Sequence, residues 1–219
     1  MGRIEACRIF QHAVSGLYAI TPDEQDTAEL LRKVRLALLG GARILQYRNK
    51  SADAALRAEQ AGELRRLTHE FSVPLIINDD AALALQAEAD GVHLGGDDGS
   101  LAEARALLGS DKIIGVSCYN RPELARAAVR QGADYVAFGA FFASGIKPGA
   151  VKADVVLLQT ARRELSVPIA AIGGVTPQNG AALIEAGADA LAVISALWDA
   201  PDIGQAAREF SILFSKASS

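Results

Sequence analysis

The sequence predicts an α/β protein folded as a (β/α)8 TIM barrel, and three observations predict it. Eight short and nearly uniformly apolar segments alternate with helical segments, as in a parallel sheet covered on both faces. Short patterns recur at equivalent turns of the alternation. Polar residues gather after the apolar segments, where a barrel carries its functional groups. The length of 219 residues suits one such barrel.

The expected strands share short apolar runs bounded by Gly, Pro or Asp. Each is too short for a buried helix and is rich in Val, Ile and Leu. Their expected ranges are 16–21, 44–50, 74–78, 91–94, 112–117, 134–138, 168–172 and 190–194.

The expected helices are recognised by apolar residues at helical spacing and by their end signals. Asp26 or Thr27 caps the first helix after strand 16–21, Ser51 or Asp53 caps the next, and Ser100 caps another. Their expected ranges are about 3–13, 26–39, 51–71, 79–87, 100–109, 122–131, a helix ending near 165, a helix starting at 177, and 203–214.

Faint internal repeats support one closed array. Ser72-Val73-Pro74 recurs as Ser166-Val167-Pro168, and Gly132-Ala133-Asp134 recurs as Gly187-Ala188-Asp189. Because no linker divides these repeats, we expect one barrel domain over residues 1–219, with an N-terminal extension at 1–15 and an active-site loop at 139–152. An open doubly wound sheet is the alternative, but its Gly-x-Gly-x-x-Gly turn after the first strand is missing.

Composition excludes several classes of protein. A net charge of −4 argues against nucleic-acid binding through bulk charge. Cys7 and Cys118 lie far apart without the spacing of a disulfide framework or a zinc site. No apolar run is long enough to span a bilayer and no leader segment opens the chain, so we expect a cytoplasmic protein with no membrane partner.

One polar strand end predicts an anion site. Alternation along the segment 44–50 places Gln46, Arg48 and Lys50 on one side of the strand. An amide and two cations converging there suit a polyanion, because Arg offers a planar fork and Lys a point charge. The alternative is an edge strand with a solvated basic tip.

Asp79 and Asp98, the latter beside Asp97, close the third and fourth strands. Carboxylates on adjacent strands can share a hard cation that also holds substrate phosphates. The alternative is a role as helix caps or first-turn residues, where acidic side chains are favoured anyway.

Two further strand ends predict a phosphate site. Gly173-Gly174 and Ser195 follow the seventh and eighth strands, where barrels often bind phosphate through backbone amides. A tight turn is the alternative. The sequence allows two interpretations of the loop 141–149, which contains Lys147. It is either a lid over the substrate or a solvated surface loop. We expect His93 to be a satisfied core histidine and Cys118 a buried or half-buried thiol.

Several segments in this order make the chain resemble thiamine-phosphate synthase (thiamine-phosphate pyrophosphorylase) over about residues 16–198. The segments that carry the resemblance are Gly16-Leu17-Tyr18-Ala19-Ile20-Thr21, Gln46-Tyr47-Arg48-Asn49-Lys50, Ile77-Asn78-Asp79, Asp90-Gly91-Val92-His93-Leu94-Gly95, Gly115-Val116-Ser117, the loop 142–147, Ile172-Gly173-Gly174 and Val193-Ile194-Ser195-Ala196.

The resemblance implies a Mg2+-dependent transferase. It would join a hydroxymethylpyrimidine diphosphate to a hydroxyethylthiazole phosphate by a dissociative path, giving thiamine phosphate and pyrophosphate. It also implies the residue roles. The diphosphate contacts would be Arg48, Lys50, Lys147 and Asn78, the Mg2+ ligands Asp79 and Asp98, the pyrimidine contacts Gln46 and Ser117, and the thiazole-phosphate contacts Ser144, Gly174, Ile194 and Ser195.

Departures from the family pattern keep two alternatives open. Gly96, Ala143 and Ile146 stand where the family commonly has Gln, Pro and Thr. The alternatives are a thiazole tautomerase-like or other phosphate-binding barrel isomerase, and a phospholigand-binding protein that has lost catalysis. A tautomerase is expected to have a His shortly after the Ser of the fifth strand, where this chain reads Ser117-Cys118-Tyr119-Asn120. The sequence leaves the oligomeric state open, and a homo-oligomer is compatible with it.

Overall fold

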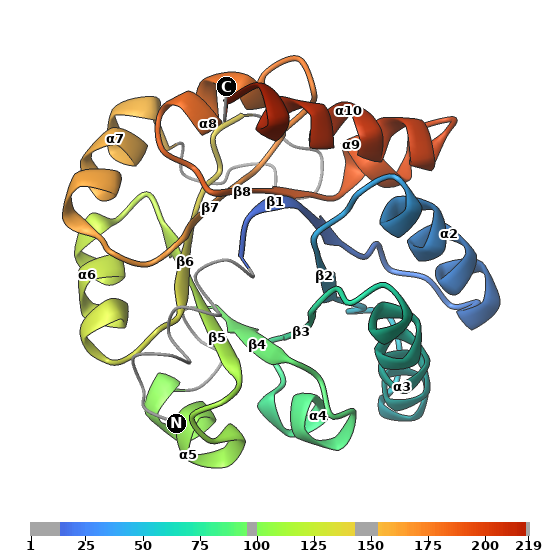
Figure 1. The fold of residues 1–219 in the computed structure, drawn as a ribbon. Coiled ribbons are helices and arrows are strands. Elements are labelled where there is room, and N and C mark those ends of the chain that lie inside the picture. Colours follow the sequence, from blue (N-terminus) through green and yellow to red (C-terminus); the bar gives the residue numbers. More distant parts are fainter. Residues whose placement is uncertain (1–13, 96–99, 143–152, 218–219) are drawn as a thin grey trace.

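Eight parallel strands close into a barrel in a computed structural model that describes residues 14–95, 100–142 and 153–217 (Figure 1). The closure is given by β1, which pairs with β2 on one side and with β8 on the other. The predicted barrel is therefore confirmed, and the open doubly wound sheet is wrong. The strands are β1 (Gly16–Ile20), β2 (Ile44–Tyr47), β3 (Leu75–Asn78), β4 (Gly91–Leu94), β5 (Ile113–Tyr119), β6 (Tyr135–Phe138), β7 (Ile169–Ile172) and β8 (Ala190–Val193).

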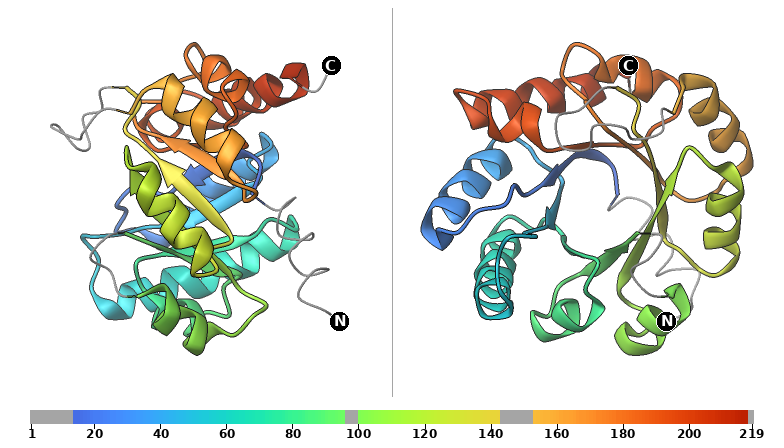
Figure 2. Two further views of the ribbon diagram at one scale, coloured as in Figure 1. Left: turned by 90° about the vertical axis from the view of Figure 1, so that its left-hand side faces the viewer. Right: turned by 180° about the vertical axis from the view of Figure 1, so that it is seen from behind.

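Helices form the outer ring of the barrel (Figures 1 and 2). They are α2 (Thr27–Leu39), α3 (Ala54–Glu70), α4 (Ala81–Gln86), α5 (Leu101–Leu108), α6 (Pro122–Arg130), α7 (Val155–Glu164), α8 (Gly180–Glu185), α9 (Ser195–Trp198) and α10 (Ile203–Ala217). Within these described residues, no helix combines the length and apolarity needed to cross a membrane.

The helix caps decide between the alternatives that the sequence left open. Asp26 and Asp53 are the N-caps of α2 and α3, and each side chain accepts a backbone N–H of the first turn. Ser100 caps α5 in a capping box, as expected. The eighth helix was expected at Pro177 but begins at Gly180, because the intervening residues form a turn. The expected helix at 3–13 lies outside the described residues.

Strand alternation divides the core into two layers. One face of each strand points into the barrel and the other packs against the helices. The interior cluster combines large and small side chains, namely Val14, Tyr18, Ile20, Ile44, Ile76, Ile113, Tyr135, Ala137, Ala170, Ala190 and Ala192. Gly115 on β5 makes room for one of the large rings, since a Cβ there would lie 2.0 Å from Tyr135 Cζ.

The repeated Asp before a strand is a backbone clamp at the N-terminal end of the barrel. Asp134 Oδ2 accepts the N–H of Ile114 at 2.7 Å and an N–H of Arg105 at 2.6 Å. The same arrangement recurs at Asp90 with Leu75 and at Asp189 with Ile169. The Gly-Ala-Asp repeat therefore serves stability, at the end of the barrel opposite the polar strand ends.

Asp134→Ala should lower the free energy of unfolding by about 2–3 kcal/mol, because it leaves a half-buried N–H and a guanidinium without their acceptor. Urea denaturation measures this loss. Asp134→Asn is the matched control, because its amide oxygen can still accept one bond and should recover part of the stability. A loss below about 0.5 kcal/mol in the Ala variant, the level of an ordinary surface substitution, would contradict the clamp.

Candidate active site

The polar end of β2 is fixed to the end of β1. The hydroxyl of Thr21 donates to the carbonyl oxygen of Arg48 and accepts the N–H of Arg48, both at 2.8 Å. Gln46 lies two residues earlier and points into the barrel, where it is 3% exposed. The strand ends at Tyr47, so the predicted alternation reaches Gln46, which faces inward, while Arg48 and Lys50 follow on the turn at the mouth of the barrel.

Asp23 organises both cations and was missed by the sequence reasoning. Its Oδ1 accepts from Arg48 Nη1 at 2.9 Å and from the backbone N–H of Lys50 at 3.0 Å. The strand-end rule offered a signal, because Thr21-Pro22-Asp23 directly follows the first strand. A carboxylate thus holds the guanidinium in place until a stronger anion competes for it.

Asn49 locks the turn between the two cations. The side chain is buried and donates to the carbonyl oxygen of Glu24 at 2.6 Å, while its Oδ1 accepts the N–H groups of Ser51 and Ala52. Gln60 from α3 also accepts from Asn49 and donates to the same Glu24 carbonyl. Asn49 is therefore a structural residue that fixes the backbone from which Arg48 and Lys50 project.

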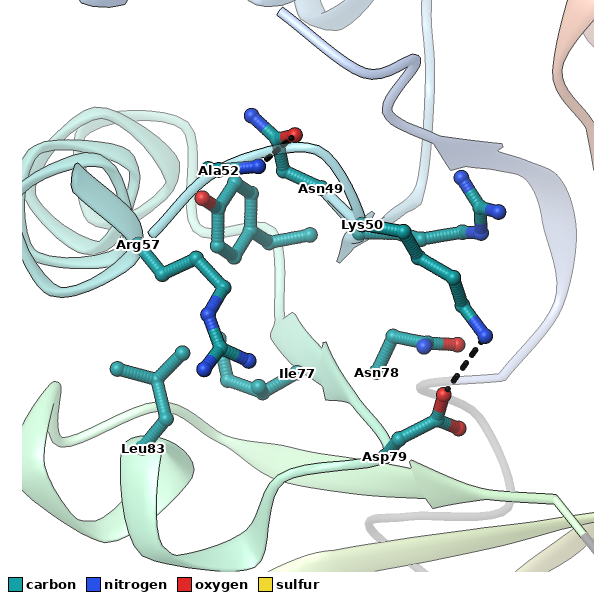
Figure 3. A pocket seen from close by; sticks show the side chains of 10 residues that line it. Asn49, Lys50, Ala52, Arg57, Ile77, Asn78, Asp79 and Leu83 are labelled. Carbon is teal, nitrogen blue, oxygen red and sulfur yellow. Dashed lines mark hydrogen bonds and ion pairs between the residues drawn. The ribbon is translucent and has the colours of Figure 1, made fainter. Parts of the chain in front are cut away.

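Asp79 projects toward Lys50 from the end of β3 (Figure 3). Lys50 Nζ lies 3.4 Å from Asp79 Oδ2, and the two side chains are 57% and 26% exposed. Asp79 adopts a left-handed backbone with φ 64°, and the N–H of Asp80 bonds back to the carbonyl oxygen of Asn78. Asp80 is the N-cap of α4, so the helix-cap alternative for Asp79 is wrong.

A cavity of about 350 Å³ lies between these two strand ends. Its polar lining comprises Arg48, Asn49, Lys50, Arg57, Asn78 and Asp79. Arg57 reaches into it from α3 (Figure 3). Arg57 Nη1 also lies 3.5 Å from Asp80 Oδ2. Sequence reasoning missed Arg57 because it lies inside a helix and not at a strand end. The cavity therefore gathers three cations beside one accessible carboxylate.

A chain of buried hydrogen bonds crosses the barrel interior and joins Gln46 to Ser117. Gln46 Nε2 donates to the Tyr18 hydroxyl at 2.8 Å, and the hydroxyls of Tyr18 and Tyr135 lie 2.7 Å apart. His93 Nδ1 lies 2.7 Å from the Tyr135 hydroxyl, and His93 Nε2 lies 2.9 Å from Ser117 Oγ. The expectation of a satisfied core histidine at His93 is confirmed, and its link to Ser117 is a new finding.

Burial keeps the two phenols of this chain protonated. Desolvation raises the pKa of Tyr18 and of Tyr135 above the ordinary value, because both rings are completely enclosed. At neutral pH each hydroxyl therefore has one proton to donate.

The ends of β7 and β8 form the turns at which the sequence predicted a phosphate site. Gly173 and Gly174 both have positive φ, at 103° and 62°, a conformation that glycine adopts without strain. Asn179 Nδ2 holds the Gly174 carbonyl oxygen at 3.0 Å. On the adjacent strand, Ile194 precedes the short helix α9, whose first residue is Ser195. The structure thus brings these residues to neighbouring strand ends, as the sequence predicted.

Part of the predicted site lies outside the described residues. This applies to Asp97, Asp98, Ser144, Lys147 and to the departures Gly96, Ala143 and Ile146. Within the described ranges, no group of three or more His, Cys, Asp or Glu side chains gathers to hold a metal ion. Any metal site built on Asp79 alone would need further ligands from substrate, from water or from residues beyond these ranges.

Comparison with known proteins gives one consistent family. The family model for thiamine monophosphate synthase matches residues 17–197. A thiamine-phosphate synthase of Thiobacillus denitrificans is 56% identical over 199 residues, which cover 91% of this chain and 94% of that protein. A thiamine-phosphate synthase of Methylobacillus flagellatus is 58% identical over 201 residues, covering 92% and 96%.

Solved structures agree with these relatives. Thiamine phosphate pyrophosphorylase from Pyrococcus furiosus superimposes with a TM-score of 0.86 at 31% identity, covering 96% of this chain and 100% of that one. A geranylgeranylglyceryl phosphate synthase from Thermoplasma acidophilum has a TM-score of 0.71 at 16% identity, over 98% of each chain. At that identity the second likeness shows the fold alone.

Cys118 should react slowly in the folded protein although it follows Ser117. The thiol is buried, as expected, and burial raises the pKa of Cys118 to about 12. In a Cys7→Ser background, iodoacetamide at pH 8 should therefore modify native protein on the order of a thousandfold more slowly than urea-unfolded protein, because the native thiolate is so scarce. Mass spectrometry follows the adduct. Rates within about tenfold of each other would contradict the buried environment.

Proposed function

The chain belongs to the thiamine monophosphate synthase family, and on this premise we propose how its residues carry out the reaction that names the family. It is a transferase of thiamine biosynthesis. We propose that it condenses 4-amino-2-methyl-5-hydroxymethylpyrimidine diphosphate with 4-methyl-5-(2-hydroxyethyl)thiazole phosphate. The products are thiamine phosphate and pyrophosphate. The observation that carries the residue assignment is the convergence of Arg48, Lys50 and Asp79 on one cavity at the strand ends.

The diphosphate binds at the mouth of β2 and β3. Arg48 and Lys50 now pair with Asp23 and Asp79, at 2.9 Å and 3.4 Å. A diphosphate carries more charge than either carboxylate and can draw both cations toward itself. Lys147 would add a third contact from the loop 139–152, and Asn78 a neutral one. Their shared task is to neutralise the leaving group.

Asp79 is suited to hold Mg2+ together with the diphosphate. Its carboxylate is accessible, is not used as a helix cap, and lies within reach of the same cavity. Mg2+ commonly takes one or two protein carboxylates and completes its shell with substrate phosphates and water. Asp98 would be the second carboxylate. When bound, the ion supplies positive charge to the departing pyrophosphate.

Bond cleavage precedes coupling in this mechanism. The bond between the pyrimidine methylene and the diphosphate oxygen breaks, and its electron pair leaves with the pyrophosphate. The thiazole nitrogen then attacks the methylene cation and becomes the positively charged nitrogen of thiamine phosphate. No proton is transferred and no protein nucleophile is needed. The cations at β2 stabilise the charge that develops on the leaving group, and the barrel holds the two rings in line.

The two rings occupy different parts of the barrel mouth. Gln46 and Ser117 would contact the pyrimidine, since both face the interior at the ends of β2 and β5. Gly174, Ile194 and Ser195 would hold the thiazole phosphate through the turns after β7 and β8, with Ser144 reaching in from the loop. The cytoplasm, where thiols stay reduced, is the proposed location.

The direct assay is formation of thiamine phosphate by the purified chain from both substrates and Mg2+. We expect product that depends on all three components. Turnover of the thiazole phosphate without any pyrimidine diphosphate would instead favour a tautomerase-like isomerase. Tight binding of both substrates without product would favour the phospholigand-binding alternative.

Arg48→Ala and Asp79→Ala should each lower kcat/KM by more than about tenfold, because each removes a charge next to the leaving group. The melting temperature should change little in Arg48→Ala, whose side chain is partly exposed, and should fall modestly in Asp79→Ala, because alanine tolerates the left-handed φ of 64° less well than aspartate. Arg126→Ala is the control, because Arg126 forms a 2.7 Å ion pair with Glu164 on the helix surface, away from the strand ends. Full activity in Arg48→Ala would refute its role at the diphosphate.

A further inference from the structure

We propose that Tyr18, Tyr135 and His93 form a positioning network that sets the hydrogen-bonding roles of Gln46 and Ser117 together. In the order given below, Gln46 presents an acceptor and Ser117 presents a donor. This inference rests on the proposed function, in which these two residues contact the pyrimidine. The three linking residues need not touch the substrate, so they act as positioning residues and not as catalytic residues.

The order of the protons follows from the end at Gln46. Gln46 Nε2 can only donate, so the Tyr18 hydroxyl accepts from it at 2.8 Å. The single Tyr18 proton then goes to the Tyr135 hydroxyl, 2.7 Å away. The Tyr135 proton has His93 Nδ1 as its acceptor, also at 2.7 Å. Each tyrosine hydroxyl accepts one hydrogen bond and donates one, so all hydrogen bonds of the network point from Gln46 toward His93.

The same counting fixes the end at Ser117. Because His93 Nδ1 accepts, a neutral imidazole carries its proton on Nε2. That proton is donated to Ser117 Oγ at 2.9 Å. The Ser117 hydroxyl keeps its own proton for another acceptor. At the opposite end, Gln46 Oε1 keeps its acceptor capacity.

A reversed order would exchange both ends at once. If the Gln46 amide turned over, every link would have to reverse, and Ser117 would accept where it now donates. The two ends therefore always differ in role while the chain is intact. A 4-aminopyrimidine matches such a pair of unlike ends, since its amino group donates and its ring nitrogens accept.

Burial strengthens the dependence of the Ser117 hydrogen-bonding role on that of Gln46. Tyr18 is 1% exposed, Tyr135 is fully buried, and Gln46 is 3% exposed. Bulk water is thus kept from these groups and cannot replace a missing partner. Gly115 adds a steric constraint, because a Cβ there would lie 2.4 Å from the Tyr135 hydroxyl. The backbone of β5 therefore leaves space for the Tyr135 ring, whose hydroxyl is in the middle of the hydrogen-bonded network.

Tyr135→Phe tests the network, because it removes the middle hydroxyl and keeps the ring. We expect the KM of the pyrimidine diphosphate to rise by about tenfold or more, since Gln46 and Ser117 are no longer held in matched roles. The KM of the thiazole phosphate should stay within about twofold. The analogue that lacks the 4-amino group serves as a competitive inhibitor. The ratio of its inhibition constant to the KM of the pyrimidine diphosphate measures the preference for the amino group, and this ratio should fall by a similar factor.

Tyr47→Phe is the matched control. It also removes a buried tyrosine hydroxyl, which donates to Gln60 Oε1 at 2.8 Å between the barrel and α3. Both variants should lose similar stability in urea, but only Tyr135→Phe should change the preference for the amino group. Any loss of diphosphate affinity in Tyr47→Phe, through Gln60 and Asn49, is shared by the analogue and leaves the preference unchanged. If the preference falls equally in Tyr47→Phe, the effect is one of general stability and the network proposal is wrong.

Tyr18→Phe provides a second break in the same chain and covers the case in which Tyr135→Phe does not fold. It should raise the same KM, and the double variant should be little worse than either single one, because a chain already broken loses little by a second break. Fully additive effects, or an unchanged KM in folded single variants, would overturn the network. A wild-type protein that forms no thiamine phosphate would instead contradict the proposed function.

Discussion

The hydrogen bond between the Tyr18 and Tyr135 hydroxyls joins the two sides of the barrel interior. The residues are 117 positions apart in the sequence, so the contact exists only because the barrel closes. A closed barrel forces the inward-facing side chains to satisfy one another, since bulk water does not reach them. Gln46 and Ser117 lie at the two ends of the buried network, where a substrate in the barrel mouth can contact them.

The cations depend on a different support. Arg48 and Lys50 project from a turn whose backbone is held by Asn49, and Asp23 binds the guanidinium of one and the backbone of the other. Rigid placement of this kind lowers the reorganisation needed when charge appears on a leaving group. The barrel therefore separates two tasks. Its interior orients a ring by directional hydrogen bonds, and its rim holds charge.

The sequence predicted the features that depend on local pattern. Eight apolar runs predicted the strands, and the pattern of segment 44–50 placed Gln46, Arg48 and Lys50 at one strand end, although only the structure shows that Gln46 faces inward and that β2 stops at Tyr47. Asp79 was placed at the end of β3, but only the structure separates it from Asp80, the residue that caps α4. Asp23 could have been found by applying the strand-end rule to the first strand. Tyr18 and Tyr135 could not, because each looks like an ordinary apolar strand residue until closure brings their hydroxyls together. The site residues in 96–99 and 143–152 remain predictions of the sequence.

A crystal structure with pyrophosphate and Mg2+ tests the central claim most directly, because that claim places the leaving group at the ends of β2 and β3. We expect pyrophosphate oxygens bonded to Arg48 and Lys50, and the metal ion on the Asp79 carboxylate beside them. Lys50 should then have moved from Asp79 toward the phosphate. Pyrophosphate bound elsewhere, with the Arg48–Asp23 and Lys50–Asp79 pairs intact, would contradict the account.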